Sequence, residues 1–433
     1  MVNLQIECLM RCLILVRHLT RYMKVLYLNP YFYPENVASS YLGHDVREAL
    51  VETGAKIVLY TPTPSRGVSD DIRKEYKTTK KHEVWYNGKM RIHRFSLMKE
   101  GKNPVGRALR YLVQNIKQFN MAVFAKDARF CDVMLIASTP PTQGVMAAFV
   151  KKIRHIPFVY NLQDIFPDSL VHTGLTRKGS LLWKIGRKIE DFTYRSADKI
   201  IVISEDFKKN IIAKGVPENK IVVVPNWADT EDVYPIDRKD NILIKRYNLD
   251  LNKFYITYSG NIGYTQNMDM LLDTAKEITN EDIRFILIGE GAAKENVERR
   301  VKEEQIENVI MLPFQPYEDI AHVFSLGDAG LIISKPGVSS NSVPSKTWSI
   351  MAAERPILAS FDKDSELCRL IEKVGCGVTV QAGDKEALKE KIEELYNQKE
   401  KQMGKKGREY LQTYLNKDKC VGMYVETLKS VCR

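Results

Sequence analysis

Residues 254–267, FYITYSGNIGYTQN, place a short apolar run directly before a loop that contains two glycines. The run Phe254–Ser259 is rich in aromatic and β-branched side chains, which is typical of a buried strand in a parallel sheet. Gly260 and Gly263 allow the backbone to approach a phosphate group closely. The stretch therefore indicates an open α/β sheet with a ligand loop at the carboxyl end of a strand.

The same alternation of apolar runs and amphipathic stretches extends along the chain from Met23, as in strand–helix units of a parallel sheet. The expected strands are residues 25–29, 55–60, 132–137, 157–161, 199–203, 221–224, 254–259, 284–288, 309–312, 329–333, 356–359 and 377–380. Residues 41–51, 385–400 and 407–431 are expected to be helices.

A polar pause at residues 229–250 interrupts this pattern and predicts a domain boundary. The fold class is therefore α/β, with two doubly wound parallel-sheet (Rossmann-like) domains that face a central cleft. The expected parts are an N-terminal extension (1–22), a first domain (23–228), a linker (229–250), a second domain (251–408) and a C-terminal helix (409–433) that packs back across the domain boundary.

Composition favours a soluble protein with anionic partners. The 433 residues carry a formal charge of +11, and the seven cysteines are scattered without a C-x-x-C pair, which indicates reduced thiols rather than disulfides or zinc ligands. No apolar run is long enough to span a membrane. Residues 1–22 are interpreted as an extension, with a short membrane-surface helix as the alternative.

Residues 340–353, SNSVPSKTWSIMAA, open a helix in a way that suits a diphosphate. Pro344 fits a first helical turn, Ser342 can cap it, and Lys346 adds a cation to the free backbone N–H groups. An ordinary capped helix is the alternative. The candidate nucleotide-sugar residues are Gly260, Asn261, Gly263, Gln266, Gly289, Gly291, Asn341, Ser342, Ser345, Lys346 and Ser349.

Carboxylates follow a first-domain strand, where the catalytic groups of open sheets lie. Asp164 is the preferred acid/base or substrate-hydroxyl partner and, with Lys346, a catalytic candidate; Asp168 is expected to cap a helix. The candidate acceptor-binding residues are Glu35, Asn36, Ser39 and His172. A solvated turn is the alternative for Glu35 and Asn36, and a surface histidine for His172.

Metal binding is not expected. The pattern Asp362-Lys363-Asp364 resembles the D-x-D motif of metal-dependent sugar transferases, but it lies where a helix begins, so capping is the preferred interpretation. No cofactor is predicted.

A basic stretch suits an anionic membrane surface, because Leu181, Leu182, Trp183 and Ile185 alternate with lysines and arginines. A solvated helix face is the alternative. Nucleic-acid binding is not expected, since no recognised binding motif accompanies the charge.

Several segments resemble glycosyltransferase family 4, the retaining sugar-nucleotide transferases with the GT-B fold, over about residues 23–430. They are residues 33–40 (YPENVASS), 163–169 (QDIFPDS), 202–205 (VISE), 224–229 (VPNWAD), 259–263 (SGNIG) and 344–353 (PSKTWSIMAA). The Pro-Ser-Lys variant is similar to bacterial N-acetyl-L-fucosaminyl transferases of O-antigen or capsule synthesis.

This resemblance implies a nucleotide-sugar donor, with UDP as the expected nucleotide, on the second domain and an acceptor on the first. The implied acceptor is a lipid-linked saccharide of the undecaprenyl diphosphate type, used in O-antigen, capsule or exopolysaccharide synthesis. The implied location is cytoplasmic, peripheral on the inner face of the cytoplasmic membrane.

Two features depart from the family pattern. The paired glutamates of its E-x7-E motif are replaced by Asn341 and Ser349, and the Arg and Lys that usually hold the diphosphate correspond to Asn261 and Gln266. Lys346 is expected to compensate. A UDP-sugar 2-epimerase-like enzyme and a non-catalytic GT-B scaffold are the alternative functions.

Overall fold

The computed structural model describes residues 22–35, 40–101, 103–172, 176–227, 230–338, 344–398 and 401–432. By contacts, the chain divides into two compact units. Met1–Gln163, Ile189–Ile201 and Val421–Arg433 form the first unit, and Asp164–Lys188 and Val202–Cys420 form the second.

The amino-terminal half of the chain builds an eight-stranded sheet with the order β3-β4-β2-β1-β5-β6-β7-β8. Its strands are β1 (Lys24–Leu28), β2 (Lys56–Pro62), β3 (His82–Trp85), β4 (Met90–Phe95), β5 (Val133–Ala137), β6 (Phe158–Leu162), β7 (Lys199–Val202) and β8 (Ile221–Val223). The central strand β1 pairs in parallel with β2 and β5, and its Val25, Leu26 and Leu28 are fully buried. A sheet buried on both faces needs such continuous apolar strands.

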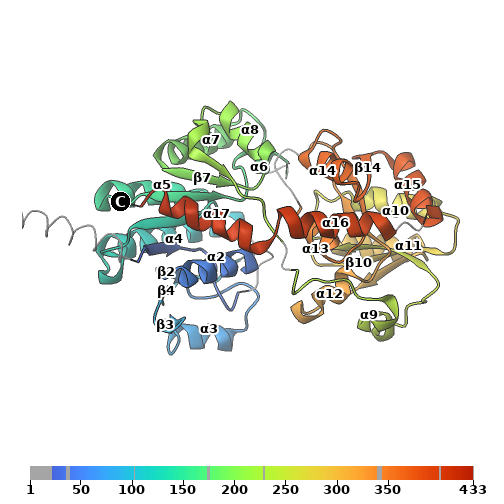
Figure 1. Cartoon of the computed structure of the whole chain (residues 1–433), viewed down its shortest axis with the longest axis horizontal. Coiled ribbons are helices and arrows are strands. Elements are labelled where there is room, and N and C mark those ends of the chain that lie inside the picture. The colour runs from blue at the N-terminus through green and yellow to red at the C-terminus, as the bar shows by residue number, and fades with distance from the viewer. Residues whose placement is uncertain are drawn as a thin grey trace, which may run out of the picture. The chain divides into compact units, whose positions relative to one another are not determined.

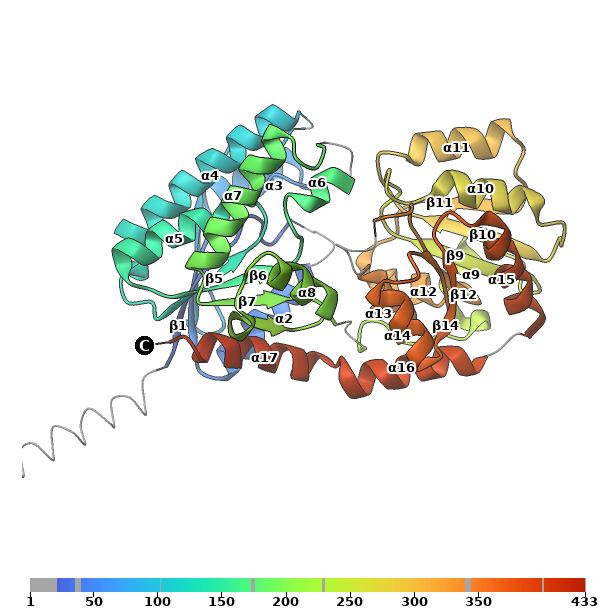
Figure 2. The same cartoon turned by 90° about the horizontal axis from the view of Figure 1, so that it is seen from above.

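The helices of this half are α2 (Ser40–Glu52), α3 (Asp70–Lys77), α4 (Pro104–Phe124), α5 (Gln143–Arg154), α6 (Asp168–His172), α7 (Leu181–Ser196) and α8 (Glu205–Ala213), with short 3₁₀ turns η1 (Lys126–Ala128) and η2 (Glu218–Lys220). In the first unit α4 and α5 lie side by side on one face of the sheet, and α2 lies on the other (Figures 1 and 2). Helices on both faces are the doubly wound arrangement that the sequence predicts.

The carboxyl-terminal half builds an all-parallel six-stranded sheet with the order β11-β10-β9-β12-β13-β14. Its strands are β9 (Phe254–Ser259), β10 (Ile283–Ile288), β11 (Val309–Leu312), β12 (Ala329–Ile333), β13 (Ile357–Phe361) and β14 (Gly377–Gln381). The strand order reverses between β9 and β12. Ligands of open α/β sheets bind at the carboxyl ends of strands beside such a reversal.

The helices of this half are α9 (Ile242–Arg246), α10 (Met268–Glu277), α11 (Lys294–Glu303), α12 (Ile320–Phe324), α13 (Lys346–Ala352), α14 (Glu366–Val374), α15 (Lys385–Gln398), α16 (Lys401–Tyr414) and α17 (Lys417–Lys429), with the 3₁₀ turns η3 (Arg238–Asp240) and η4 (Tyr317–Asp319). Leu271 of α10 and Leu388 of α15 pack into a core on one face of the sheet. Trp348 of α13 and Leu411 of α16 pack into another core.

The end of α17 belongs to the first unit, where the Tyr424 hydroxyl lies 3.1 Å from Asn161 Oδ1 at the carboxyl end of β6. The expected domain boundaries themselves remain a prediction.

All twelve predicted strands are present, and their ends differ from the prediction by at most two residues. Two expectations were wrong in detail, because two strands were missed and the terminal helix is divided. The sequence did not predict β3, which is antiparallel to β4, or β4 itself. The expected polar linker contains η3 and α9, and the expected terminal helix 407–431 is two helices, α16 and α17.

Candidate functional site

Two glycine loops pack against each other at the carboxyl ends of β9 and β10. Gly260 N–H donates to the Ile288 carbonyl (2.9 Å), and Ile262 N–H donates to the Glu290 carbonyl (2.9 Å). A Cβ at Gly289 would lie 1.9 Å from the Gly260 carbonyl oxygen. Gly289 is therefore required by backbone packing, and the two loops form one surface, as the sequence predicts.

Gly291 is required for the same reason. A Cβ on this residue, whose φ is +156°, would lie 2.3 Å from the Ile262 carbonyl oxygen. Its backbone conformation is one that side chains with a Cβ rarely adopt.

The side chains of Asn261 and Gln266 brace this surface. Gln266 Oε1 accepts hydrogen bonds from Gly263 N–H (3.1 Å) and from Asn261 Nδ2 (3.4 Å). Asn261 is exposed and Gln266 is half-buried, so both retain polar atoms for a ligand. The loop is also tied to the strand beyond the reversal, because Lys335 N–H donates to the Thr265 carbonyl (2.8 Å).

Lys346 is the first residue of α13, and its side chain extends to this same surface. Its Nζ lies 3.5 Å from the centroid of the Tyr258 ring and 3.0 Å from the position of a Cβ at Gly260. No carboxylate in the described part of the chain pairs with this ammonium. Burial lowers the pKa of Lys346 to about 7. An ammonium held without a counter-ion beside a phosphate-compatible loop is suited to bind an anion.

The start of α13 is described from Pro344 onward, so the expected cap by Ser342 stays a prediction. The residue that precedes the helix is Ser345, and its side chain makes no capping hydrogen bond. The N–H of Thr347 donates to the Pro344 carbonyl (3.0 Å), so the first turn closes at Pro344. Asn341 and Ser342 lie outside the described residues. Ser345 is exposed and Ser349 is half-buried.

The contact of Lys346 with Tyr258 was missed by sequence reasoning. Tyr258 is fully buried in β9, and an aromatic side chain in a buried strand is typical of a core residue. Its hydroxyl donates to the Asn261 carbonyl (2.5 Å). No local pattern identifies a strand tyrosine as the support of a distant lysine.

The loop after β6 carries Asp164, which is exposed. Asp168, at the start of α6, has a structural role, because its carboxylate pairs with Lys214 Nζ (2.7 Å) and accepts from Trp183 Nε1 (3.3 Å). A Cβ at Gly186 of α7 would lie 2.7 Å from Pro167 Cβ. The loop that bears Asp164 is therefore fixed against α7. The side chain of His172 lies outside the part of the chain that the structure describes.

Of the candidate acceptor-binding residues, Glu35 is the one whose side chain the structure describes. Glu35 was a candidate acceptor-binding residue with a solvated turn as the alternative, and that alternative was wrong, because Glu35 is 3% exposed. Its Oε1 accepts from the backbone N–H groups of Ser65 (2.7 Å) and Arg66 (2.9 Å). Burial raises the pKa of Glu35. Asn36 and Ser39 lie outside the described residues.

The D-x-D segment neither caps a helix nor forms a metal cluster in the described chain. Asp362 accepts from Gly337 N–H through both carboxylate oxygens (3.0 Å each). The capping residue of α14 is Ser365, whose hydroxyl accepts from Cys368 N–H. The expectation that these aspartates cap the helix was therefore wrong, because Asp362 fixes a neighbouring loop instead.

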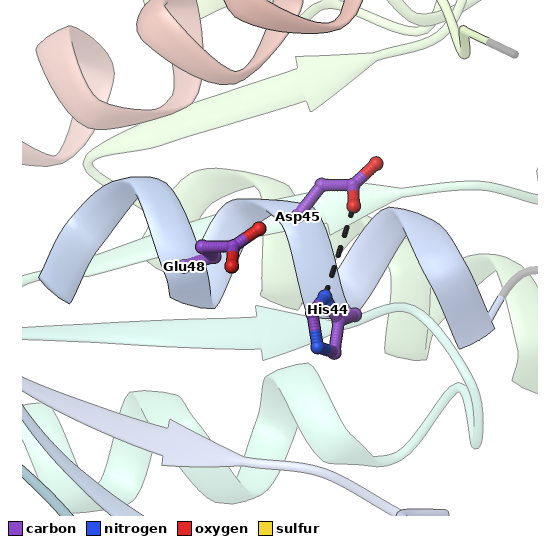
Figure 3. A group of neighbouring side chains, drawn as sticks. All are labelled: His44, Asp45 and Glu48. Carbon is purple, nitrogen blue, oxygen red and sulfur yellow. Dashed lines mark ion pairs between the residues drawn. The ribbon is translucent and has the colours of Figure 1, made fainter. Parts of the chain in front are cut away.

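A group of possible metal ligands lies on α2, where donor atoms of His44, Asp45 and Glu48 lie within 4.8 Å of one another (Figure 3). His44 Nδ1 lies 3.8 Å from Asp45 Oδ1, and Arg47 interacts electrostatically with Asp45. Ion pairing accounts for this cluster, and we assign no metal to it. The cysteines among the described residues, Cys131, Cys368, Cys376, Cys420 and Cys432, are free thiols.

Comparison with known families gives two matches that together span most of the chain. Residues 41–227 match the family described as "Glycosyl transferase 4-like domain", and residues 239–410 match "Glycosyl transferases group 1". The second match contains the glycine loops and Lys346.

Two curated relatives are similar in sequence. A probable glycosyltransferase, WbjE of Pseudomonas aeruginosa, is 28% identical over 287 residues, which cover 66% of this chain and 72% of the relative. The putative colanic acid biosynthesis glycosyl transferase WcaI of Escherichia coli K12 is 26% identical over 276 residues, which cover 63% and 67% of the two chains.

Two solved structures share the fold. Anabaena Alr3699/HepE in complex with UDP aligns with a TM-score of 0.70 at 16% identity, over 94% of this chain and 100% of that chain. Sucrose-phosphate synthase from Thermosynechococcus elongatus aligns with a TM-score of 0.75 at 14% identity, over 94% and 99%. No helix in the described part of the chain is long and apolar enough to cross a membrane.

Proposed function

The chain is a glycosyltransferase with the GT-B fold, built from a 4-like and a group 1 domain, and we propose that it uses a UDP-sugar donor. The observation that carries this proposal is the ammonium of Lys346 beside Gly260, which no carboxylate among the described residues pairs with. A diphosphate would supply the negative charge that the described residues do not place beside this ammonium. HepE, which shares the fold, was solved with UDP and with UDP-glucose.

The proposed reaction transfers the sugar to a lipid-linked saccharide with retention of anomeric configuration, in O-antigen, capsule or exopolysaccharide synthesis. The names of both curated relatives support a transferase, and that of WcaI supports colanic acid as a kind of product. These names favour transfer over the epimerase and scaffold alternatives. The likeness to fucosaminyl transferases stays a prediction.

In this mechanism Lys346 and the loop amides stabilise the negative charge that develops on the departing diphosphate. The ammonium is already in place, so the charge meets a fixed cation rather than reorganising water. Asp164, on the loop fixed by α7, is the proposed partner of the acceptor hydroxyl. Asp164 orients that hydroxyl or accepts its proton. The second group that can accept the proton is an oxygen of the departing diphosphate.

The outer side of α7 is the proposed membrane contact. Leu181, Leu182 and Ile185 are exposed, and beside them Lys184 and Lys188 have no carboxylate partner in the described chain. A hollow of about 300 Å³ lies among the side chains of Leu181, Trp183, Lys184, Ile185, Arg187 and Lys188. Each cation near an anionic membrane contributes about 1 kcal/mol, and each inserted aliphatic side chain contributes a similar or larger amount. Trp183 was also expected on this surface; it lines the hollow, and its indole N–H donates to Asp168 Oδ1 (3.3 Å).

The proposed function is tested with purified protein and a panel of UDP-sugars, with and without lipid-linked saccharides. We expect saturable consumption of one donor and a product of added mass on the acceptor. No consumption of any nucleotide sugar would contradict the proposal. For the membrane contact, Ile185→Glu is expected to reduce sedimentation of the protein with anionic vesicles at least fivefold. The control is Leu251→Glu, which changes another exposed aliphatic side chain and is expected to leave sedimentation unchanged. Equal sedimentation of both variants would contradict it.

A further inference from the structure

We propose that Arg66 and Arg110, grouped around Tyr31 in the first unit, form a second anion site that binds the phosphate groups of the lipid-linked acceptor. The inference rests on the proposed function, which supplies the lipid-linked acceptor. No residue of this site belongs to the donor surface described above.

The site lies where two neighbouring parallel strands end. Tyr31 and Glu35 follow β1, Ser65 and Arg66 follow β2, and the strands pair in register from Lys24 with Lys56 to Leu28 with Tyr60. The two loops are joined by the Glu35 carboxylate, which accepts from the N–H groups of Ser65 and Arg66. The backbone that carries Arg66 is therefore held in one position at the sheet edge where ligands bind.

Arg110 is a buried cation with an unused donor. It projects from α4, is 1% exposed, and donates from Nε to the Met98 carbonyl (3.2 Å) and from Nη2 to the Ser65 hydroxyl (3.0 Å). Its Nη1 is buried and makes no hydrogen bond within the described residues. A buried charged donor without an acceptor is costly, and such groups mark sites where water or a ligand completes the bonding.

Arg66 adds an exposed cation beside the same ring. The guanidinium carbons of Arg66 and Arg110 each lie 5.8 Å from the centroid of the Tyr31 ring. The side chain of Arg66 has no carboxylate partner in the described chain. Each guanidinium group is a forked donor of the kind that binds phosphate oxygens.

The charge of the cluster also favours an anion. Tyr31 donates to Glu100 Oε2 (3.0 Å), and Arg107 Nε lies 3.6 Å from Glu100 Oε1. The buried guanidinium of Arg73 is satisfied by backbone carbonyls rather than by carboxylates. Cations therefore outnumber anions, with Arg66, Arg73, Arg107 and Arg110 against Glu35 and Glu100.

The helix that supplies Arg110 also presents an apolar stripe to solvent. Val105, Leu109, Leu112 and Ile116 follow the spacing of one helix face and are each more than half exposed. Arg107 and Arg110 lie in the first turns of this same helix. The stripe lies on the solvent side of α4 and Arg110 lies on its buried side, so the stripe is not part of the anion site.

The probe is farnesyl diphosphate. Farnesol and inorganic pyrophosphate, which carry its hydrocarbon and its anionic group separately, are the comparison compounds. Saturating UDP is present to occupy the donor surface. Binding is measured by equilibrium dialysis with wild-type protein, Arg66→Gln and the control Arg129→Gln, another exposed arginine of the first unit. We expect farnesyl diphosphate to bind the wild type and the control, and Arg66→Gln to bind it at least tenfold more weakly. Pyrophosphate competes, and farnesol does not bind at the same concentration.

Equal affinity of Arg66→Gln and Arg129→Gln, or binding of farnesol as tight as that of farnesyl diphosphate, would overturn the anion site. So would the absence of binding to the wild type. These results leave the donor reaction untouched, because consumption of UDP-sugar is measured separately. In transfer assays we expect Arg66→Gln to raise the KM for the lipid-linked acceptor at least tenfold, with the donor KM within twofold of the wild type.

Discussion

The ammonium of Lys346 lies 3.5 Å from the centroid of the Tyr258 ring, and no carboxylate of the described chain pairs with it. Attraction to the face of an aromatic ring recovers part of the hydration that a buried ammonium loses, but less than a carboxylate would recover. The protein therefore holds a cation that is stabilised fully only when an anion arrives.

Replacement of Lys346 by Met is expected to stabilise the protein while it weakens donor binding. Because the pKa of Lys346 is lowered to about 7 from 10.5, the unfolded chain binds the proton more tightly than the folded chain. After allowance for the partial exposure of the side chain, the gain at pH 7 is about 1 to 3 kcal/mol. Urea unfolding checks this, and a variant less stable than the wild type would contradict the interpretation.

Donor use is expected to weaken as the pH rises through about 7. In the proposed function the ammonium form binds the diphosphate, and in the free enzyme this form is lost above the lowered pKa of Lys346. The kcat/KM for the donor should be constant below pH 6 and then fall about tenfold per pH unit well above 7. Lys346→Arg keeps its charge and should remove this fall, at a lower absolute rate. A wild-type profile that is flat up to pH 9 would show that the ammonium is not used.

Gly289→Ala is expected to separate the two glycine loops. Its Cβ would lie 1.9 Å from the Gly260 carbonyl oxygen, so a backbone shift is needed that costs about 1 to 3 kcal/mol. UDP affinity should fall with it. The control is Gly422→Ala in α17, where a Cβ meets no atom within 4 Å and the change stabilises the helix by about 0.5 to 1 kcal/mol. The same loss of UDP affinity in both variants would contradict the assigned role of the loops.

Asp164→Asn is expected to lower turnover more than donor affinity. The carboxylate is exposed on a loop fixed by α7, and its proposed partner is the acceptor hydroxyl rather than the nucleotide. Loss of a positioned acid/base group lowers kcat by about 10²- to 10⁴-fold. Steady-state kinetics with saturating acceptor separate kcat from the donor KM. A variant with wild-type turnover would remove Asp164 from the mechanism.

Most of the fold could be predicted from the sequence, because the strands of a parallel sheet are continuous apolar runs between amphipathic helices. The exceptions are short or charged. His82–Trp85 has no apolar run, and Met90–Phe95 alternates its apolar residues with Arg91, His93 and Arg94. Arg94 is buried and pairs with Glu83 Oε2 (2.9 Å), so its place in a strand depends on a partner that the local pattern does not reveal.

The candidate site could be predicted only in outline. Chain order alone brings Gly260, Gly289 and Lys346 to one sheet, since loops that follow parallel strands share an edge. The contact between Lys346 and Tyr258, and the burial of Glu35 against the backbone of Ser65, depend on packing between segments far apart in the sequence. No spacing rule contains that information.

The most direct test of the central claim is the affinity of UDP, measured by calorimetry at pH 6.5, for wild-type protein, Lys346→Ala and the control Lys239→Ala, an exposed lysine in η3. The loss of one charge-assisted contact to a diphosphate corresponds to about 1.5 to 3 kcal/mol, or roughly 10- to 150-fold in Kd. We predict this loss for Lys346→Ala and an unchanged Kd for Lys239→Ala. Equal UDP affinity of all three proteins would contradict the claim that Lys346 binds the donor diphosphate.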